Sequence, residues 1–562
     1  MMKKWLKASS AAMAAVLACG IFTACTDFGK DPPDQTDEDD ERYTVTYDVN
    51  GGTMTSDSSV TVDAGESVTL PEASMEDAEL SGWYLGTTFV GAPGASYTPT
   101  TNVTLTAQWE GEPVVDYAAV NYDRAIEYSK LINELYWNSN TKLSSLTPSG
   151  GTPCLWPFTE QVSMVNGILL TMDKEDEDYA FYVQYLEELI EGLRHYRVNS
   201  VNPQAWENED HYFADFGETD GTANAYAIYN SGRNDYAIDS VSTNAGSVFF
   251  DDNVWVAKEF YYAYVNTGKA EYFNEAVNIL NWIVGEGYES TTGLNGIYWN
   301  WAAKFMFEGS GSLSDSTHAS LNACSSAPTA MMLAKVYQTM TEDAQFTEKF
   351  AALAPDYLSK AQNIYEFCFS VLRNPSNGCL RDKVFLREGF EEMSSLSQQI
   401  QLYDEQILPY NTGTYMTAGA ELYNIAVKQD NTAVAGVYLD RNTEVATAAD
   451  RQFANTQVVE GQYSYNSNSW FTSFLLEGFI DLSASVEECS EYIEHMRSAL
   501  DYAWNNNRAE DGLVCPAWIT GWDAYSDDNP NSEGNPRQIL LQSANAHCYA
   551  MLARYYAAVE AK

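Results

Sequence analysis

Hydrophobic and polar positions alternate between Tyr43 and Trp109, where apolar side chains recur every second residue. This spacing is typical of β-strands with one buried face, so the pattern predicts several short strands. Asn50-Gly51-Gly52 interrupts the first run and predicts a tight turn. The apolar positions that define the runs are Val45, Tyr47, Val49, Val60, Val62, Val103, Leu105 and Ala107.

Beyond Val114 the apolar residues recur at three- and four-residue spacing, which predicts amphipathic helices. Thr267-Gly268-Lys269 separates one helix from the next, and that pair ends in the glycine loop Gly296-Ile297-Tyr298-Trp299. Similar loops lie at 378–380 and 512–514. Repeated hairpins with loops at one end predict a mainly α toroid, an α/α barrel, with a stacked solenoid as the alternative. The predicted helices span 117–137, 179–196, 254–267, 272–284, 327–340, 357–372, 415–427, 470–482, 489–504 and 539–559.

The N-terminus predicts an export signal over residues 1–24, with early lysines before an alanine-rich apolar run. Ile21-Phe22-Thr23-Ala24-Cys25 resembles a bacterial lipobox, and Cys19 is a weaker alternative. Lipidation of Cys25 would anchor the protein to a membrane by acyl chains, so we expect a lipoprotein of the bacterial cell surface or envelope. Residues 25–42 are acidic and contain Pro32-Pro33, which predicts an extended tether.

Composition narrows the partners. The formal net charge of -49 argues against nucleic acid, because phosphates require stripes of Lys and Arg. Fourteen Trp and 38 Tyr suit a carbohydrate partner, since aromatic rings stack on sugar faces, although aromatic residues also build cores. Cysteines outside the signal region form no CxxC pair and the histidines show no ligand spacing, so we expect no disulfide framework, no metal and no cofactor.

The strand-rich segment carries a specific pattern. The stretches 45–53, Gly82-Trp83-Tyr84 and 103–109 resemble the Listeria-Bacteroides repeat, the internalin B-type repeat. Leu80-Ser81 replaces the aromatic residue that usually precedes Gly82-Trp83. The resemblance implies that residues 43–110 form a small β-grasp-like surface module. We expect this module to act as a spacer, and a ligand-binding or adhesive role is the alternative.

Asp251 and Asp252 are the strongest candidates for chemistry. They follow Phe249-Phe250 and precede Val254-Trp255, at the start of an apolar helix. Joint ionisation of two adjacent carboxylates is unfavourable when they lie against large apolar groups. The pairs at 39–40 and 527–528 lie in polar sequence, where water can solvate both charges. An Asp N-cap followed by a solvated Asp is the alternative. Cleavage of a glycosidic bond needs two carboxyl groups with different proton affinities, and a helix start can separate them.

Four segments of the helical region carry a second resemblance: Asp251-Asp252-Asn253-Val254-Trp255, Leu294-Asn295-Gly296-Ile297-Tyr298-Trp299-Asn300, Asn322-Ala323-Cys324-Ser325-Ser326-Ala327-Pro328 and Tyr410-Asn411-Thr412-Gly413. In this order they resemble motifs of glycoside hydrolase family 76, the bacterial endo-α-1,6-mannanases and their fungal relatives. Ser326 stands where the family has Asn, and Thr412 where it has Gln. Both departures leave the preference of the sugar subsites open.

The resemblance implies an (α/α)6 barrel over residues 115–562 that cleaves α-1,6-mannosidic linkages of α-mannan with retention. Asp251 becomes the nucleophile and Asp252 the acid/base. Residues 298–299 are expected to be exposed in their loop. Six residues become candidates for the substrate cleft: Asn253, Trp255, Tyr298, Trp299, Asn322 and Asn411. Core packing is the alternative for Trp255. Helix capping is the alternative for Asn322 and Asn411.

Two other functions stay open at this point. A transglycosidase would pass the glycosyl group to another mannose-containing glycan. A non-catalytic adhesin would use an inactive barrel and bind glycans through the β module. The intact Asp pair favours an enzyme.

Overall fold

The computed structural model describes residues 42–75, 78–110, 115–197, 200–201, 225–226, 237–238, 248–301, 319–456, 458–465, 467–525 and 535–560. The predicted signal peptide, Cys25 and residues 25–41 of the tether lie outside the described residues, as do the Asp pairs at 39–40 and 527–528. The chain divides into two compact units between Asp116 and Tyr117. Each unit is described by itself.

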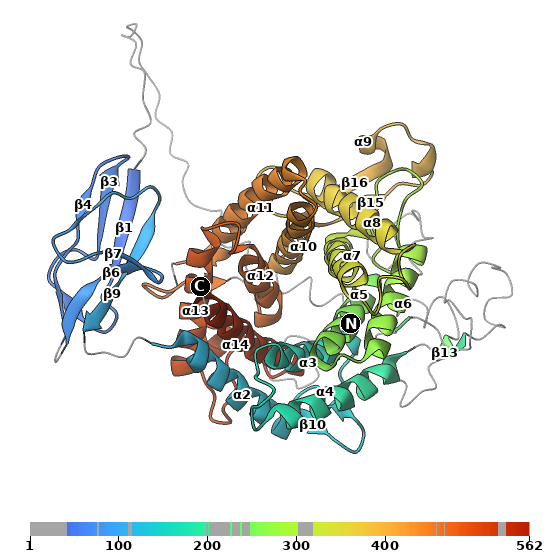
Figure 1. Ribbon diagram of the computed structural model, residues 1–562, viewed down its shortest axis with the longest axis horizontal. Coiled ribbons are helices and arrows are strands. Elements are labelled where there is room, and N and C mark those ends of the chain that lie inside the picture. The colour runs from blue at the N-terminus through green and yellow to red at the C-terminus, as the bar shows by residue number, and fades with distance from the viewer. Residues whose placement is uncertain are drawn as a thin grey trace, which may run out of the picture. The chain divides into compact units, whose positions relative to one another are not determined.

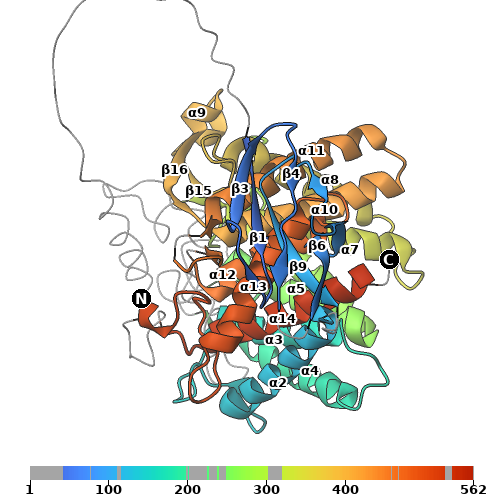
Figure 2. The ribbon, with the colours of Figure 1, turned by 90° about the vertical axis from the view of Figure 1, so that its left-hand side faces the viewer.

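The N-terminal unit is a five-stranded sheet in the order β3-β1-β9-β6-β7 (Figures 1 and 2). Its first and last strands, β1 and β9, pair in parallel, as in a β-grasp fold. The strands span Arg42–Asp48 (β1), Ser59–Asp63 (β3), Glu79–Leu85 (β6), Thr88–Gly91 (β7) and Val103–Glu110 (β9). The strands predicted from the alternating pattern are present, and the β-grasp-like fold that the resemblance implied is confirmed.

Alternation along β9 builds the core of this unit. Leu105, Ala107 and Trp109 are buried and pack with Val45 and Trp83, while Thr106 and Gln108 between them are partly exposed. The predicted turn after β1 is present, with Asn50 at φ 44° and Gly51 at φ 83°. Asparagine and glycine tolerate this left-handed backbone, which explains the Asn-Gly sequence.

The second unit is a closed double ring of helices (Figure 1). Six of the described helices form the inner ring: α3 (Leu155–Leu169), α5 (Phe250–Thr267), α7 (Ala323–Glu342), α10 (Pro409–Lys428), α12 (Ser469–Leu482) and α14 (Ile539–Glu560). Each contacts the next in this order, and α14 contacts α3. A solenoid would leave its first and last helices apart, so closure confirms the (α/α)6 barrel.

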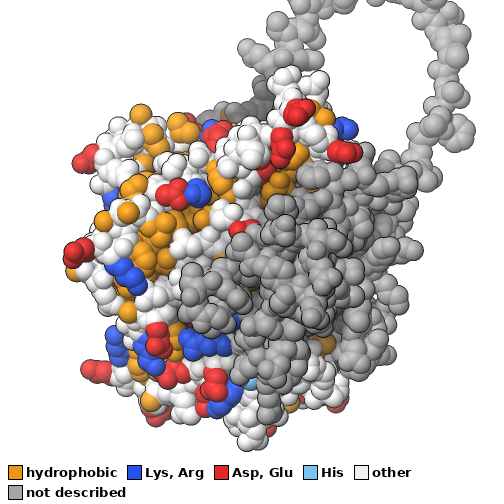
Figure 3. All heavy atoms as spheres, turned by 90° about the vertical axis from the view of Figure 1, so that its right-hand side faces the viewer, with side chains coloured by type: hydrophobic (Ala, Val, Ile, Leu, Met, Phe, Trp, Pro, Cys, Tyr) orange, Lys and Arg blue, Asp and Glu red, His pale blue; other side chains and the backbone are white. Residues whose placement is uncertain are grey.

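Six further described helices pack outside the inner ring: α2 (Tyr117–Tyr136), α4 (Tyr179–Leu193), α6 (Ala270–Glu286), α8 (Ala354–Phe367), α11 (Thr432–Phe453) and α13 (Cys489–Asn506). The inner helices are buried almost all round, whereas the outer ones bury one stripe and expose the other. On the described part of the face in Figure 3, acidic and basic side chains lie intermixed. Among the described helices, none is long and apolar enough to cross a bilayer.

The glycine loops at 296–299 and 378–380 lie at the N-terminal end of the inner helices. Side chains near the start of these helices accept hydrogen bonds from the backbone of both loops. Ile297 donates its N–H to Ser326 Oγ of α7 at 2.9 Å. Leu380 donates its N–H to Thr412 Oγ1 of α10 at 3.2 Å. Ser326 and Thr412, the two residues that depart from the resembled motifs, thus bind loops to helices. Their hydroxyl groups are used within the fold.

A small antiparallel sheet lies at the same end and was not predicted. It consists of β14 (Ser320–Asn322), β15 (Arg381–Leu386) and β16 (Ile400–Ile407). β14 runs directly into α7, and every residue of β15 is buried. The sheet therefore carries residue 382 to the start of α7 and α10.

Candidate active site

Asp251 and Asp252 occupy the first turn of α5, which begins at Phe250. Phe250 is fully buried and stacks on Trp282 of α6, with 4.9 Å between ring centroids. Its N–H also donates to the carbonyl oxygen of Trp299 at 2.9 Å. The aromatic residue before the pair thus anchors the helix start, and the free amides of the first turn favour negative charge there.

The Asp251 carboxylate accepts hydrogen bonds on both oxygens. The Asp252 N–H donates to Oδ1 at 3.0 Å, and the Trp299 indole N–H donates to Oδ2 at 3.1 Å. Burial raises the pKa of Asp251 to about 6, while the hydrogen bonds from Asp252 and Trp299 oppose that rise. At neutral pH its carboxylate is therefore largely ionised.

Asp252 has a different environment. Its side chain is partly accessible to solvent, and no hydrogen bond to its carboxyl group comes from the described residues that surround it. Burial and then the charge of Asp251 raise its pKa well above the ordinary value. The pair consequently favours an ionised Asp251 beside a protonated Asp252, the split that an acid and a nucleophile require.

Three groups beside Asp251 were not among the predicted site residues. Cys324, in the first turn of α7, is buried, and burial followed by the charge of Asp251 raises the pKa of its thiol. Asp382 of β15 is 7% exposed, accepts from Asn411 Nδ2 at 3.3 Å and pairs with Lys383 at 2.9 Å. Its charge raises the pKa of Cys324 and Tyr410. Cys324 and Tyr410 lie inside the resembled motifs, but nothing in the sequence places Asp382 beside them.

The structure brings only part of the predicted cleft set to the pair. Asn253 is fully buried, and its amide donates to the carbonyl oxygens of Tyr226 and Phe249 at 2.9 and 2.7 Å. Trp255 is 4% exposed and packs on Phe474 with 4.7 Å between ring centroids. Both side chains hold the fold together at this end, which is the core alternative for Trp255.

The predicted loop residues 298 and 299 differ from each other. Tyr298 is partly exposed, and burial followed by the charges of Glu289 and Glu391 raises its pKa. Trp299 is only 8% exposed, so its expected exposure is wrong. Its indole turns inward because Asp251 accepts its N–H, and its ring packs on Phe249.

Asn322 and Asn411 are both buried near the helix starts. Asn322 stands at the N-cap of α7 without a capping side-chain bond, and Asn411 is in the first turn of α10, after the N-cap Leu408. Neither side chain caps its helix, so the capping alternative fails. The Oδ1 atoms of both have no hydrogen-bond partner within the described structure.

Aromatic side chains from three inner helices meet beside Tyr410. Phe471 lies 5.0 Å from Tyr410 and Trp470 5.3 Å, between ring centroids. Trp156 of α3 follows at 5.0 Å from Trp470. Trp156 and Phe471 are partly exposed, so each can offer a ring to a sugar. Sequence reasoning missed both, because their exposure depends on how the helices meet.

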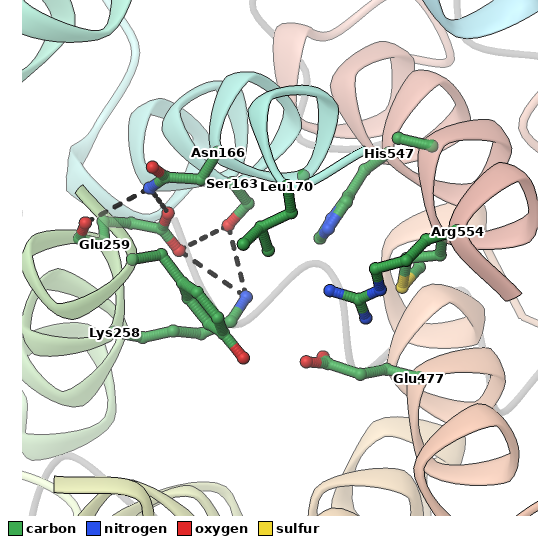
Figure 4. A pocket seen from close by; sticks show the side chains of 12 residues that line it. Ser163, Asn166, Leu170, Lys258, Glu259, Glu477, His547 and Arg554 are labelled. Atoms are coloured by element: carbon green, nitrogen blue, oxygen red, sulfur yellow. Dashed lines mark hydrogen bonds and ion pairs between the residues drawn. The ribbon is translucent and has the colours of Figure 1, made fainter. Parts of the chain in front are cut away.

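A polar pocket inside the barrel contains none of these residues (Figure 4). Its lining includes Lys258 and Glu259 of α5, Glu477 of α12, and His547 and Arg554 of α14, which point toward one another. Lys258 Nζ lies 3.6 Å from Glu259 Oε1. Ser163 and Asn166 of α3 donate to the Glu259 carboxylate at 2.6 and 2.8 Å, so hydrogen bonds link these two neighbouring inner helices. The described residues offer no group of His, Cys, Asp and Glu that could hold a metal ion.

Comparisons with known proteins agree with this geometry. Residues 43–108 match the family model of the Listeria-Bacteroides repeat domain, so the N-terminal unit is such a repeat. No curated protein gives a significant match to the chain.

Solved structures resemble the helical unit. A family 76 glycoside hydrolase from a bovine Bacteroides thetaiotaomicron strain is 18% identical with a TM-score of 0.55, over 83% of this chain and 83% of that chain. A family 76 mannosidase from Bacteroides thetaiotaomicron is 18% identical with a TM-score of 0.54, over 79% and 100%.

A third structure is an inactive variant of an α-1,6-mannanase from Salegentibacter sp. HEL1_6. Two consecutive aspartates are replaced by asparagine in it, and it was solved with α-1,6-mannotriose. It is 15% identical with a TM-score of 0.52, over 77% of this chain and 99% of that chain. At these low sequence identities, the structural similarity shows a shared fold.

Proposed function

We propose that the barrel is a family 76 glycoside hydrolase that cleaves α-1,6-mannosidic linkages within α-mannan. The observation that carries the proposal is the pair Asp251 and Asp252, two carboxyl groups with different proton affinities in one helical turn. The shared fold supports it. So does the inactive relative with two consecutive aspartates replaced, whose structure holds an α-1,6-mannotriose.

In this mechanism Asp251 attacks the anomeric carbon of the mannosyl unit while Asp252 gives its proton to the departing glycosidic oxygen. A covalent bond forms between Asp251 and the sugar as the glycosidic bond breaks. Asp252, now ionised, takes a proton from water, which attacks the same carbon and frees Asp251. Two inversions give overall retention. Neighbouring residues suit the separation of about 5 to 5.5 Å that retaining enzymes use.

The partly exposed rings Tyr298, Trp156 and Phe471 are the residues we expect to contact mannose units. They lie on separate elements around the start of the inner helices, so a chain of several sugars could contact more than one of them. This arrangement supports cleavage within a polymer. Asn253 and Trp255 are expected to act through the fold only.

The direct test is incubation of the protein from Tyr43 onward with linear α-1,6-mannan, followed by sizing of the products. A mixture of oligosaccharides that shortens with time supports internal cleavage. Absence of cleavage in linear α-1,6-mannan, with cleavage of another glycan, would reject the linkage. Products longer than the added acceptor oligosaccharides would identify transfer instead of hydrolysis.

The roles of the two aspartates are separable. Asp251→Asn should abolish turnover of every substrate, because no glycosyl-enzyme bond can form. Asp252→Asn should keep much of the first step with a phenolic leaving group that needs little protonation, yet lose cleavage of mannan. A phenol burst from Asp251→Asn but not from Asp252→Asn would reverse the assignment.

We also propose that Cys25 carries the lipid that attaches the protein to the bacterial envelope, on the basis of the lipobox-like run before it. Cys25→Ser should then move the protein from the membrane fraction to the soluble fraction and remove labelled palmitate, whereas Cys19→Ser should change neither. Palmitate that persists in Cys25→Ser would reject this site.

A further inference from the structure

The Asp251 carboxylate is held by a side chain from another segment of the barrel. The Trp299 indole N–H reaches Oδ2 at 3.1 Å from the loop between α6 and α7. Asp251 itself belongs to α5. The direction of the carboxylate therefore depends on how this loop is held against α5.

Ring packing and backbone hydrogen bonds hold Trp299 in place. Its ring packs on Phe249 with 4.7 Å between centroids. Its carbonyl oxygen accepts the Phe250 N–H at 2.9 Å, and its backbone N–H donates to the carbonyl oxygen of Ser320 at 3.3 Å. With only 8% of the residue exposed, the indole has little room to turn toward a sugar. The indole N–H is committed to Asp251.

Cys324, in the first turn of α7, is buried beside the same carboxylate. It is 3% exposed, and burial followed by the charges of Asp251 and Asp382 raises the pKa of its thiol well above the ordinary value. The thiol therefore keeps its proton, and a protonated thiol can act as a weak donor to a carboxylate. Its helix, α7, packs against α5, which carries Asp251.

We propose that Trp299 is a positioning residue for the reaction: its indole N–H holds the Asp251 carboxylate at the angle of attack. The inference rests on the proposed glycosidase function, and it replaces the expected sugar contact of Trp299. A carboxylate with both oxygens engaged cannot rotate freely, which favours one approach to the anomeric carbon. Loss of a donor should slow the bond-forming step and leave sugar binding intact.

The first test uses Trp299→Phe, which keeps an aromatic ring and removes the donor. We expect kcat to fall about tenfold with an unchanged KM, since a hydrogen bond to a charged group contributes about this much. The acid limb of the pH profile should move to higher pH, because the ionised carboxylate loses a donor. Trp282→Phe is the matched control, since Trp282 is equally buried and packs on Phe250 beside the pair.

The second test separates a hydrogen bond from packing at Cys324. Cys324→Ala should move the acid limb in the same direction as Trp299→Phe, whereas Cys324→Ser, which restores a donor, should return it toward the wild-type position. Cys489→Ala removes an equally buried sulfur at the start of α13 and should leave the profile unchanged.

An unchanged pH profile in Trp299→Phe would overturn the inference, as would equal shifts in the two control variants. Failure of the wild type to cleave any mannan would reject the proposed function instead. In that case the carbon-13 signal of the Asp251 carboxyl group, assigned by its loss in Asp251→Asn, still tests the positioning role. Its titration midpoint should rise in Trp299→Phe, and an unchanged midpoint would reject that role.

Discussion

At the scale of single residues, Asp252 combines chemistry with a cost in stability. Burial raises its pKa in the folded protein above that of an unfolded Asp. Its contribution to stability is therefore intact below the unfolded pKa and is lost as the pH rises toward the folded value. An acid that must stay protonated near neutral pH thus weakens the fold at high pH.

Asp252→Asn should relieve this cost because the amide does not ionise. We expect the melting temperature of the variant to exceed that of the wild type by roughly 2 °C at pH 8, with a smaller gain at pH 4. Calorimetry at both values checks the prediction. Ser96→Ala, a change on the β module far from any carboxyl pair in sequence, serves as the control. A gain that is equal at pH 4 and pH 8 would contradict the raised pKa.

Residue chemistry was predictable where neighbours in sequence create it. Asp251 and Asp252 stood out because adjacent charges meet Phe250 and Trp255. Asp382 did not, since its approach to Cys324 and Tyr410 depends on the packing of β15 against two helices. Trp299 was expected to be exposed because its loop lies between helices, and the sequence holds no sign that its N–H would bind Asp251.

At the scale of elements, two inner helices, α10 and α12, approach each other closely at Gly413 of α10. A Cβ added there would lie 2.2 Å from the carbonyl oxygen of Phe474 in α12. Gly413→Ala should therefore force the two helices apart and lower the free energy of unfolding by about 1–3 kcal/mol. Denaturant titration followed by circular dichroism measures this change.

Gly436→Ala provides the matched comparison, because Gly436 lies within α11 and an added Cβ would meet no atom within 4 Å. Alanine favours the helix over glycine by about 1 kcal/mol, so this variant should be as stable as the wild type or more so. Similar losses in the two variants would show that helix contact at Gly413 is not the cause.

Helical periodicity predicted ten of the twelve barrel helices within the described residues and missed α3 and α11. α3 is buried at nearly every position and contains Pro157, so it shows no polar stripe to reveal its period. α11 is rich in Ala and Thr, so few large apolar side chains mark its period. The β14-β15-β16 sheet was missed because its strands are far apart in the sequence.

At the scale of the whole molecule, each unit has its own hydrophobic core. The residues proposed for catalysis all belong to the helical unit. Deletion of residues 43–112 should therefore leave the turnover of soluble oligosaccharides within about twofold of the full chain, as expected for separately folded domains. Steady-state kinetics with a short α-1,6-mannooligosaccharide checks this.

Binding to insoluble mannan gives the matching measurement for the β module. As a spacer, the module should leave that binding unchanged when it is deleted. A large fall in turnover for a folded deletion variant would mean that the module contributes to the site. A fall confined to insoluble mannan would favour the glycan-binding alternative for the repeat.

The stereochemistry of the first product tests the central claim most directly, because it depends on both aspartates acting as proposed. Proton NMR during cleavage of linear α-1,6-mannan should show the α anomer of the new reducing end first, followed by slow mutarotation toward equilibrium. This result requires two successive inversions through a glycosyl-enzyme, and the Asp251→Asn and Asp252→Asn variants then assign the two roles. Initial appearance of the β anomer would contradict retention and the nucleophilic role of Asp251.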